Sequence, residues 1–165
     1  MDLAVSRLRR IVARDLELPY GSVTIYGVGH HGSFYTARMG GPFWMKIIAD
    51  GEDVTEKYPN DKITSMYREA GYGVSAQYSG ALVDQMRTAS SFLKHVLAIY
   101  HDTRVVHASV AGPNGLPGAY PCRLGEDGAE VVLHGIRLED AIEINEAGAR
   151  IDGIEKVKDD GTVVF

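Results

Sequence analysis

In the stretch Gly27-Val28-Gly29-His30-His31-Gly32-Ser33, three glycines surround two histidines. It completes an apolar run, residues 23–28, that is typical of a β-strand. Glycines let the backbone turn tightly and let another molecule approach closely. A histidine in such a turn is well placed to exchange protons near neutral pH. The stretch therefore predicts a strand that delivers a proton-transfer residue to a glycine-rich turn.

Composition places the chain among ordinary globular proteins. Its 165 residues are the usual length of one domain, so we expect a single domain over residues 1–165. A net charge of −5 gives no support for a nucleic-acid partner. The single cysteine, Cys122, excludes an internal disulfide and suits a reducing compartment. The sequence shows neither a signal peptide nor an apolar run of the roughly 20 residues that span a bilayer. We therefore expect a cytoplasmic protein with no membrane partner.

Hydrophobic periodicity divides the chain into helices and short strands. The predicted helices cover residues 3–16, 60–70, 81–101 and 138–151. The predicted strands cover residues 23–28, 43–48, 104–110, 120–124 and 130–133, followed by a hairpin over 154–165. Polar or breaker-rich segments, 55–59 and 112–118, are predicted loops. This order predicts an α+β fold in which antiparallel hairpins pack with long helices and no Rossmann domain is present. The helix over 81–101 has a wide apolar stripe, which predicts burial along much of its length.

Several motifs that would identify a catalytic class are absent from the sequence. It contains no G-x-G-x-x-G after a strand and no phosphate-binding G-x-x-x-x-G-K-[ST] loop. It also has no H-E-x-x-H, no cysteine pair for zinc and no G-x-S-x-G. If the protein uses a dinucleotide, another segment or chain must supply most of the binding site.

Two segments together resemble a known family. Leu3-Ala4-Val5-Ser6-Arg7-Leu8-Arg9 resembles the L-D-S-A-R-F-R helix that opens the C-terminal, substrate-binding domain of lactate and malate dehydrogenases. Residues 29–33 resemble their G-E-H-G-D-S turn, and the 24 positions from Arg7 to His31 align without a gap. Further on, residues 105–110 resemble the strand after that family's long helix, and residues 121–128 resemble its P-x-x-L-G-x-x-G hairpin.

The resemblance implies a role for individual residues. It makes His31 the acid/base that exchanges the proton of the substrate hydroxyl while hydride moves to or from a nicotinamide. It makes Arg7 the clamp on the carboxylate of a small 2-hydroxy or 2-keto acid, a task that suits the planar guanidinium fork. It implies NAD or NADP, bound mainly by a dinucleotide-binding domain or chain that is absent here, and a homo-oligomer. The family aspartate that orients the histidine falls on Ala4, which is a departure from the pattern.

Two alternatives remain open at this stage. His31, Phe34 and residues 51–53 also resemble the NAD- and manganese-dependent glycosidases of the same superfamily. In that interpretation His31 and Asp2 bind the metal, because aspartate is a suitable ligand for manganese. The third hypothesis is a non-catalytic oligomerisation module, which the long apolar helix and Ala4 favour.

Several of these residues also fit simpler structural roles. Arg7 also fits a solvated basic face, since Arg10 and Arg14 follow it at helical spacing. Only one residue of the histidine pair matches the family position, so we interpret His30 as non-catalytic. The remaining histidines and aromatic residues, and the cysteine, are interpreted as structural or core residues: His95, His101, His107, Cys122, Tyr26, Phe34, Phe43 and Trp44.

Overall fold

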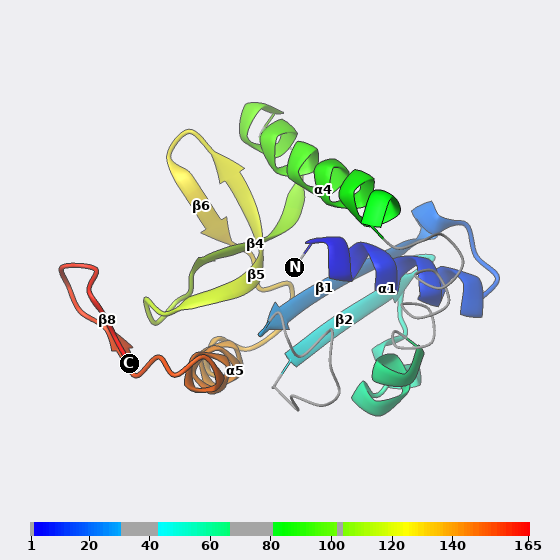
Figure 1. Ribbon diagram of the computed structural model, residues 1–165. Helices are drawn as coiled ribbons and strands as arrows, with labels where there is room; N and C mark the ends of the chain where they lie inside the picture. The colour runs from blue at the N-terminus through cyan, green and yellow to red at the C-terminus, as the bar shows by residue number, and fades with distance from the viewer. Residues whose placement is uncertain (1, 31–42, 67–80, 102–103) are drawn as a thin grey trace.

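The computed structural model describes residues 2–30, 43–66, 81–101 and 104–165, and all structural statements below concern these ranges (Figure 1). Its helices are α1 (Asp2–Asp15), α4 (Ala81–His101) and α5 (Leu138–Ile151), with a helical turn over residues 60–66 and 3-10 turns at Tyr20–Ser22 and Thr55–Lys57. Its strands are β1 (Val23–Gly29), β2 (Phe43–Ala49), β3 (Glu52–Asp53), β4 (Val105–Ala111), β5 (Pro117–Gly125), β6 (Gly128–Val131), β7 (Lys156–Val157) and β8 (Val163–Val164).

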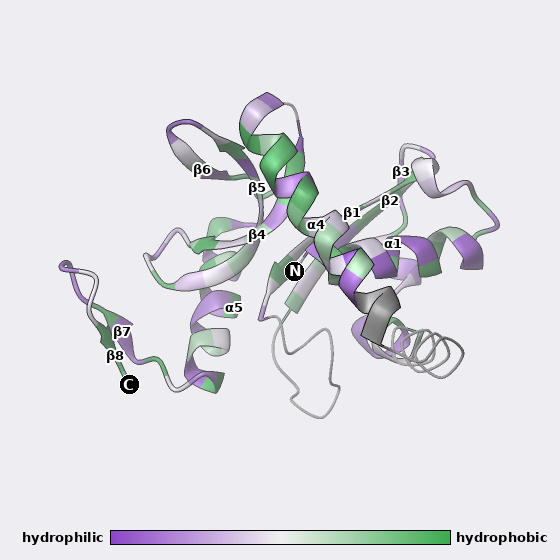
Figure 2. Cartoon of the chain, turned by 45° about the horizontal axis from the view of Figure 1, so that its top comes forward, coloured by the Kyte–Doolittle hydropathy of each residue, from purple (hydrophilic) through white to green (hydrophobic). Residues whose placement is uncertain are grey.

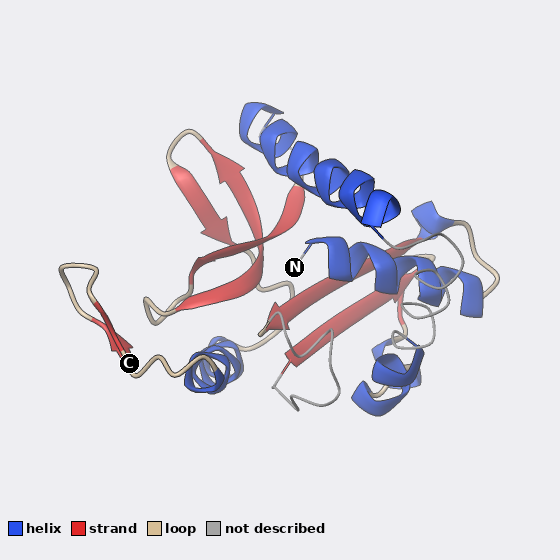
Figure 3. Cartoon of the chain, in the orientation of Figure 1, coloured by secondary structure: helices blue, strands red, loops and turns tan. Residues whose placement is uncertain are grey.

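The strands form one six-stranded antiparallel sheet and a separate small hairpin. The main sheet has the order β3-β2-β1-β5-β4, with β6 paired to β5, and β7 pairs with β8 (Figure 3). Every residue of β1 pairs with β2, from Val23↔Ala49 to Gly29↔Phe43, whereas β1 meets β5 only at Gly29↔Ala119. The expected α+β fold with antiparallel hairpins is confirmed. The sheet consists of two parts, β3-β2-β1 and β4-β5-β6, which are joined only at the pair Gly29↔Ala119; this junction is called the corner below.

Helix α1 packs on the ladder of β1 and β2 and forms the first core. Ala4, Leu8 and Val12 recur at helical spacing and are fully buried, and they pack with the fully buried Val23 and Ile47 of the strands. This arrangement explains why α1 is helical: its apolar residues form one stripe, and burying that stripe supplies most of the stability that a short helix lacks in water.

Helix α5 covers the opposite side of the same corner and forms the second core. Val28 at the end of β1, Tyr120 of β5 and Ala141 of α5 are buried together. The buried Asn145 of α5 donates from Nδ2 to Asn114 Oδ1 and to the carbonyl of Leu116, each at 3.0 Å, in the turn between β4 and β5. An amide in the core is therefore satisfied by the turn that it holds in place.

Two loop predictions need correction. Pro117 and Gly118 begin β5 instead of closing the loop before it. A proline is tolerated at the first position of a strand, where its missing N–H is not needed by the ladder. Residues 55–57 form a 3-10 turn, because the Thr55 hydroxyl accepts from the backbone N–H of Ile47 and ties this segment to β2. The predicted hairpin at the end of the chain is confirmed as β7 and β8.

The prediction that the helix over 81–101 is buried along much of its length is wrong for the chain on its own. Two of its polar residues face the body of the molecule: Lys94 contacts Asp2 of α1, and His95 contacts the carbonyl of His107 on β4. Its large apolar residues are between 44% and 79% exposed; they are Met86, Phe92, Leu93, Val96, Ile99 and Tyr100. Figure 2 shows hydrophobic positions, in green, along much of α4. No helix in the described ranges is long and apolar enough to cross a membrane.

Gly118→Ala is expected to destabilise the protein by roughly 1–3 kcal/mol, the usual cost of overpacking. The added Cβ would overlap the side-chain oxygen of Asn145 and lie 2.9 Å from the ring of Tyr120. Urea unfolding measures the effect. Gly21→Ala is the matched control, because nothing lies within 4 Å of a Cβ at that position. Adding Asn145→Ala should recover part of the loss, so strictly additive effects of the two substitutions would contradict this account.

Candidate functional site

The end of β1 carries His30, whose side chain is held by α5. Its Nε2 lies 2.9 Å from Oδ1 of Asp152, the residue that follows α5, and the imidazole is only 13% exposed. The backbone of α5 comes close here: a Cβ on Gly148 would stand 3.1 Å from the His30 Cβ. His30 is therefore anchored to α5 by packing and by a hydrogen bond to a carboxylate. His31, the sequence-predicted acid/base, lies outside the described residues.

The other sequence-predicted residues lie on α1. Arg7 is half-buried on this helix. Ala4 is in the core with no exposed surface, so this position offers no carboxylate to a histidine. The carboxylate of Asp2 is engaged by α4: its Oδ2 lies 3.1 Å from Lys94 Nζ and accepts a hydrogen bond from the Ser91 hydroxyl at 3.1 Å. The structure thus assigns Asp2 a helix-to-helix contact.

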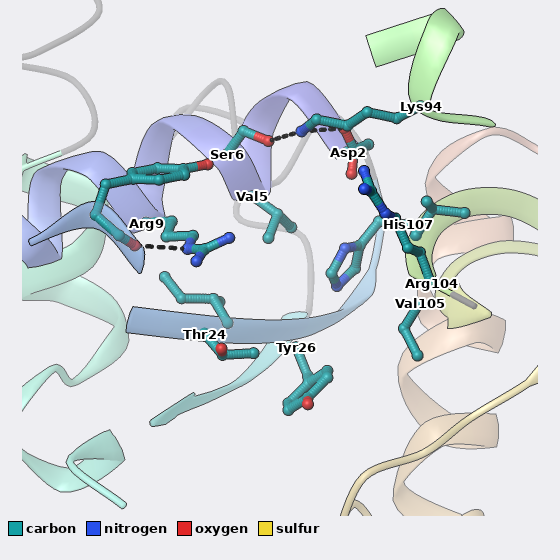
Figure 4. Close-up of a pocket in the computed structure, with 13 residues that line it drawn as sticks. Asp2, Val5, Ser6, Arg9, Thr24, Tyr26, Lys94, Arg104, Val105 and His107 are labelled. Carbon is teal, nitrogen blue, oxygen red and sulfur yellow. Dashed lines mark hydrogen bonds and ion pairs between the residues drawn. The ribbon is translucent and has the colours of Figure 1, made fainter. Parts of the chain in front are cut away.

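A pocket with a volume of about 390 Å³ lies beside α1 and includes Asp2 (Figure 4). It opens between α1, α4 and the divergent strands β1 and β4, and Arg7 is not among its lining residues. Its lining comprises Asp2, Val5, Ser6, Arg9, Tyr20, Thr24, Ile25, Tyr26, Lys94, Arg104, Val105, Val106 and His107.

Two of the three basic side chains of this pocket are bonded within the chain. The Arg9 guanidinium lies 4.2 Å from the centre of the Tyr20 ring, and its Nε donates to the Tyr20 carbonyl at 3.1 Å. Lys94 donates to the Ser6 hydroxyl at 2.9 Å in addition to its contact with Asp2. These charges therefore link α1 to the 3-10 turn at Tyr20–Ser22 and to α4, and they are directed at protein groups.

His107 lines the pocket, and only 5% of its surface is exposed. Its Nε2 accepts the backbone N–H of Gly27 at 3.0 Å, a contact between β4 and β1. Burial lowers the pKa of His107 to about 4, although the nearby Asp2 carboxylate opposes this effect. The imidazole is therefore neutral at physiological pH and acts as a hydrogen-bond acceptor.

The sequence analysis did not single out His134, which lies in the turn before α5 and contacts β1. His134 stacks on Tyr26 of β1, with ring centroids 3.7 Å apart and an angle of 18° between the planes. Burial, and then the charges of Arg123 and Lys46, lower the pKa of His134. His134 has φ +46°, a left-handed conformation in which asparagine, aspartate and histidine are the enriched residue types after glycine. An isolated histidine before a glycine was the only sequence signal for this turn.

The remaining sequence candidates have structural surroundings. His95 Nδ1 and Nε2 lie 2.7 Å from the Ser91 carbonyl and 3.1 Å from the His107 carbonyl. Cys122 is fully buried, and burial raises the pKa of its thiol, which makes the reactive thiolate scarce. Phe43 and Trp44 pack partly against the two cores, while Phe34 lies outside the described residues. In the described ranges no three histidine, cysteine or acidic residues gather to hold a metal ion, so the manganese alternative gains no support there.

Comparisons with known proteins point to one fold. No protein-family model matches the sequence, and a search of curated proteins finds no relative. Solved structures do match. Malate dehydrogenase from Plasmodium falciparum in complex with NADH superposes with a TM-score of 0.64 at 16% identity, over 92% of this chain and 53% of that one. A lactate dehydrogenase from a Medee basin deep-sea metagenome gives 0.66 at 14%, over 92% and 51%, and the minor L-lactate dehydrogenase of Enterococcus mundtii gives 0.62 at 17%, over 92% and 51%.

These similarities establish that the chain has a fold found in malate and lactate dehydrogenases. The chain spans about half the length of the solved structures it matches. At this level of identity the comparison concerns the fold, and the chemistry of the site has to be argued from the residues themselves.

The buried His107 predicts a pH dependence of stability. In the unfolded chain a histidine has a pKa of about 6.5, whereas in the folded protein the pKa of His107 is about 4. The unfolded state therefore binds the extra proton between these values, so stability is complete above pH 6.5 and falls as the pH drops toward 4. The loss from this residue is on the order of 3 kcal/mol. Urea unfolding of the wild type and His107→Leu at several pH values measures it. The carboxylates are common to both proteins, so parallel pH profiles would contradict the assignment.

Proposed function

We propose that residues 1–165 form a single substrate-binding and oligomerisation domain of a dehydrogenase-type enzyme acting on a small 2-hydroxy or 2-keto acid. The observation that carries this proposal is the fold: 92% of the chain superposes on about half of a malate or lactate dehydrogenase. The helix containing Arg7 and the strand leading to His31 are the elements in which sequence analysis expects the substrate clamp and the acid/base. The proposal corresponds to the C-terminal half of such an enzyme.

Each of the two residues has one chemical task in this proposal. Arg7 binds the substrate carboxylate through two parallel N–H···O hydrogen bonds, which the guanidinium geometry favours. His31 holds or releases the proton of the substrate hydroxyl or carbonyl oxygen. The choice of His31 within the histidine pair rests on its match to the family motif; His30 itself is bonded through Nε2 to Asp152 and packed on Gly148.

We propose NAD as the cofactor, held mainly by a segment outside this chain. One of the matched malate dehydrogenases is described in complex with NADH. The described residues do not themselves fit a dinucleotide: the main sheet is antiparallel, whereas the usual pyrophosphate site is the glycine-rich turn of a parallel strand–helix–strand unit. The chain's own contribution is therefore substrate binding and proton exchange.

Arg7→Ala in the complete enzyme is expected to lower kcat/KM for the keto acid about a hundredfold or more. The reason is that removing a charge-paired contact costs several kcal/mol of transition-state binding. Steady-state kinetics with pyruvate and with oxaloacetate measure the effect. Arg10→Ala is the matched control, since Arg10 is an exposed arginine on the same helix. Equal kcat/KM for Arg7→Ala and the wild type would remove Arg7 from the site.

A second candidate function, self-association, is supported by the outer face of α4. Its six exposed apolar side chains carry no charge, so two copies can meet there without repulsion between like charges. A standard interface takes about 800 Å² from each partner, and six large apolar side chains on one helix, each between 44% and 79% exposed, supply part of such an area. The contacts of Ser91, Lys94 and His95 on α4 are directed inward, as expected if the outer face is covered in the assembled protein. We propose a second copy of this chain as the occupant.

Light scattering of the 165-residue chain is expected to give the mass of a dimer or larger oligomer, and Leu93→Asp, which places a charge in the stripe, is expected to give a monomer. Leu138→Asp on α5 is the control, because Leu138 is also exposed and apolar but α5 lies on the other side of the molecule from α4 (Figure 1). A wild-type monomer at micromolar concentration would show that something other than a second copy covers α4.

A further inference from the structure

The turn between β4 and β5 contains the dipeptide Asn114-Gly115, the kind of step at which an asparagine side chain most readily loses its amide. Glycine has no side chain, so its backbone nitrogen can approach the carbonyl carbon of the side chain before it. The chain has three asparagines, and the other two, Asn60 and Asn145, are each followed by an acidic residue. Nothing lies within 4 Å of a Cβ built on Gly115, so this turn is open around the glycine. Sequence and surroundings therefore both mark Asn114 as the reactive asparagine.

The reaction at such a step is an internal attack followed by hydrolysis. The Gly115 nitrogen loses its proton and attacks Cγ of Asn114. The new N–C bond closes a succinimide ring, and Nδ2 takes up a proton and leaves as ammonia. Water then opens the ring at either carbonyl, which gives aspartate or isoaspartate. The reaction needs no reagent besides water, and it replaces a neutral amide by a carboxylate.

In the folded chain both reacting groups are held by hydrogen bonds. The Gly115 N–H donates to the carbonyl of Gly112 at 2.8 Å, which commits the attacking nitrogen to the turn. Oδ1 of Asn114 accepts from the Leu116 N–H at 3.2 Å and from Nδ2 of Asn145 at 3.0 Å. Attack pulls the nitrogen out of its bond to Gly112 and turns the Asn114 amide, so these hydrogen bonds have to open first.

Asn145 closes this turn from α5, a separate element that lies beside it (Figure 1). The Asn145 side chain is buried, and its Nδ2 also donates to the Leu116 carbonyl at 3.0 Å, so one nitrogen ties α5 to two residues of the turn. The fit is close, because a Cβ on Gly112 would lie 2.6 Å from this nitrogen. The turn therefore opens only when α5 or the Asn145 side chain moves away from it.

The product of the reaction fits the closed turn less well than asparagine does. Nδ2 of Asn114 is buried and has no hydrogen-bond partner among the described residues. In aspartate this atom is a carboxylate oxygen, and a buried anionic oxygen without a donor is costly. Isoaspartate lengthens the main chain of the turn by one carbon. Either product weakens the contact of the turn with α5, the helix whose end holds His30 through Asp152 and Gly148.

We propose that Asn114 is a site of spontaneous deamidation that α5 keeps closed through Asn145. Release of α5 from the turn opens the site, and the loss of ammonia makes the modification a lasting record of that release. The inference concerns only the β4–β5 turn and α5, so it does not depend on the proposed function.

The test follows deamidation of the 165-residue chain at neutral pH by mass spectrometry, since replacing an amide by an acid raises the mass of the peptide that contains it. The wild type is compared folded and unfolded in urea. Asn145→Ala removes the donor on α5. Val12→Ala is the matched control, because it weakens the core beneath α1 and leaves α5 untouched.

Asn114 in the folded wild type is expected to react roughly tenfold or more slowly than in the unfolded chain, because the hydrogen bonds of the turn must open first. Asn145→Ala is expected to lose most of this protection, whereas Val12→Ala keeps it. Equal rates in the folded and unfolded wild type would overturn the proposal. It would also be overturned if Asn145→Ala reacted at the wild-type rate or if Val12→Ala accelerated the reaction equally, because α5 would then not be what closes the site.

A second variant covers the case in which Asn145→Ala does not fold. Asn145→Ser keeps a polar side chain that is too short to bridge Asn114 and Leu116, and the same loss of protection is expected from it. The comparison of folded with unfolded wild type needs no variant and decides by itself whether the fold closes the site. Asn114→Asp supplies the aspartate product directly: its urea-unfolding midpoint is expected to lie below that of the wild type, and an unchanged midpoint would contradict the weakened contact.

Discussion

The arrangement of this protein depends on how β1 is bonded along its two edges. One edge is fully paired with β2, and this ladder carries the core beneath α1. The other edge meets β5 at a single residue, Gly29. Because the two ladders separate there, the sheet opens a space that the His107 side chain and the pocket beside α1 occupy. The corner thus produces both the pocket and the need for a side-chain acceptor.

The histidines of the chain show how surroundings decide what one residue type does. Burial in an apolar and partly cationic setting keeps His107 neutral and makes it an acceptor for a backbone amide. His30, on the opposite side of β1, lies against a carboxylate and contacts it through Nε2. His134 is stacked on an aromatic ring in a turn with positive φ. In each case the partner lies on another element than the histidine itself, so the residue type alone does not specify the role.

Helix α4 reverses the usual polarity of a surface helix. Its inward contacts include an ion pair with Asp2, hydrogen bonds to Ser6 and to the carbonyl of His107, and the small buried side chain of Ala98, whereas its large exposed residues are apolar. A helix that places charged groups against its own domain gains little from the hydrophobic effect there. The proposed contact with a second copy would supply that burial, and it would connect the assembly to the β4 residue that holds β1.

The sequence by itself determined the elements. Apolar spacing was sufficient for α1, α5 and the full length of α4, and alternation with breaker residues located β1, β2 and the hairpins, because these patterns are local. It also singled out Arg7 and His31, since motif spacing along the chain can be read directly. Only the tertiary structure decided which face of α4 is exposed and which groups hold the end of β1. The His107–Gly27 and His30–Asp152 contacts join residues 80 and 122 positions apart, and strand order and helix placement bring such pairs together. That order follows from the competition of all elements for burial, which no local pattern contains.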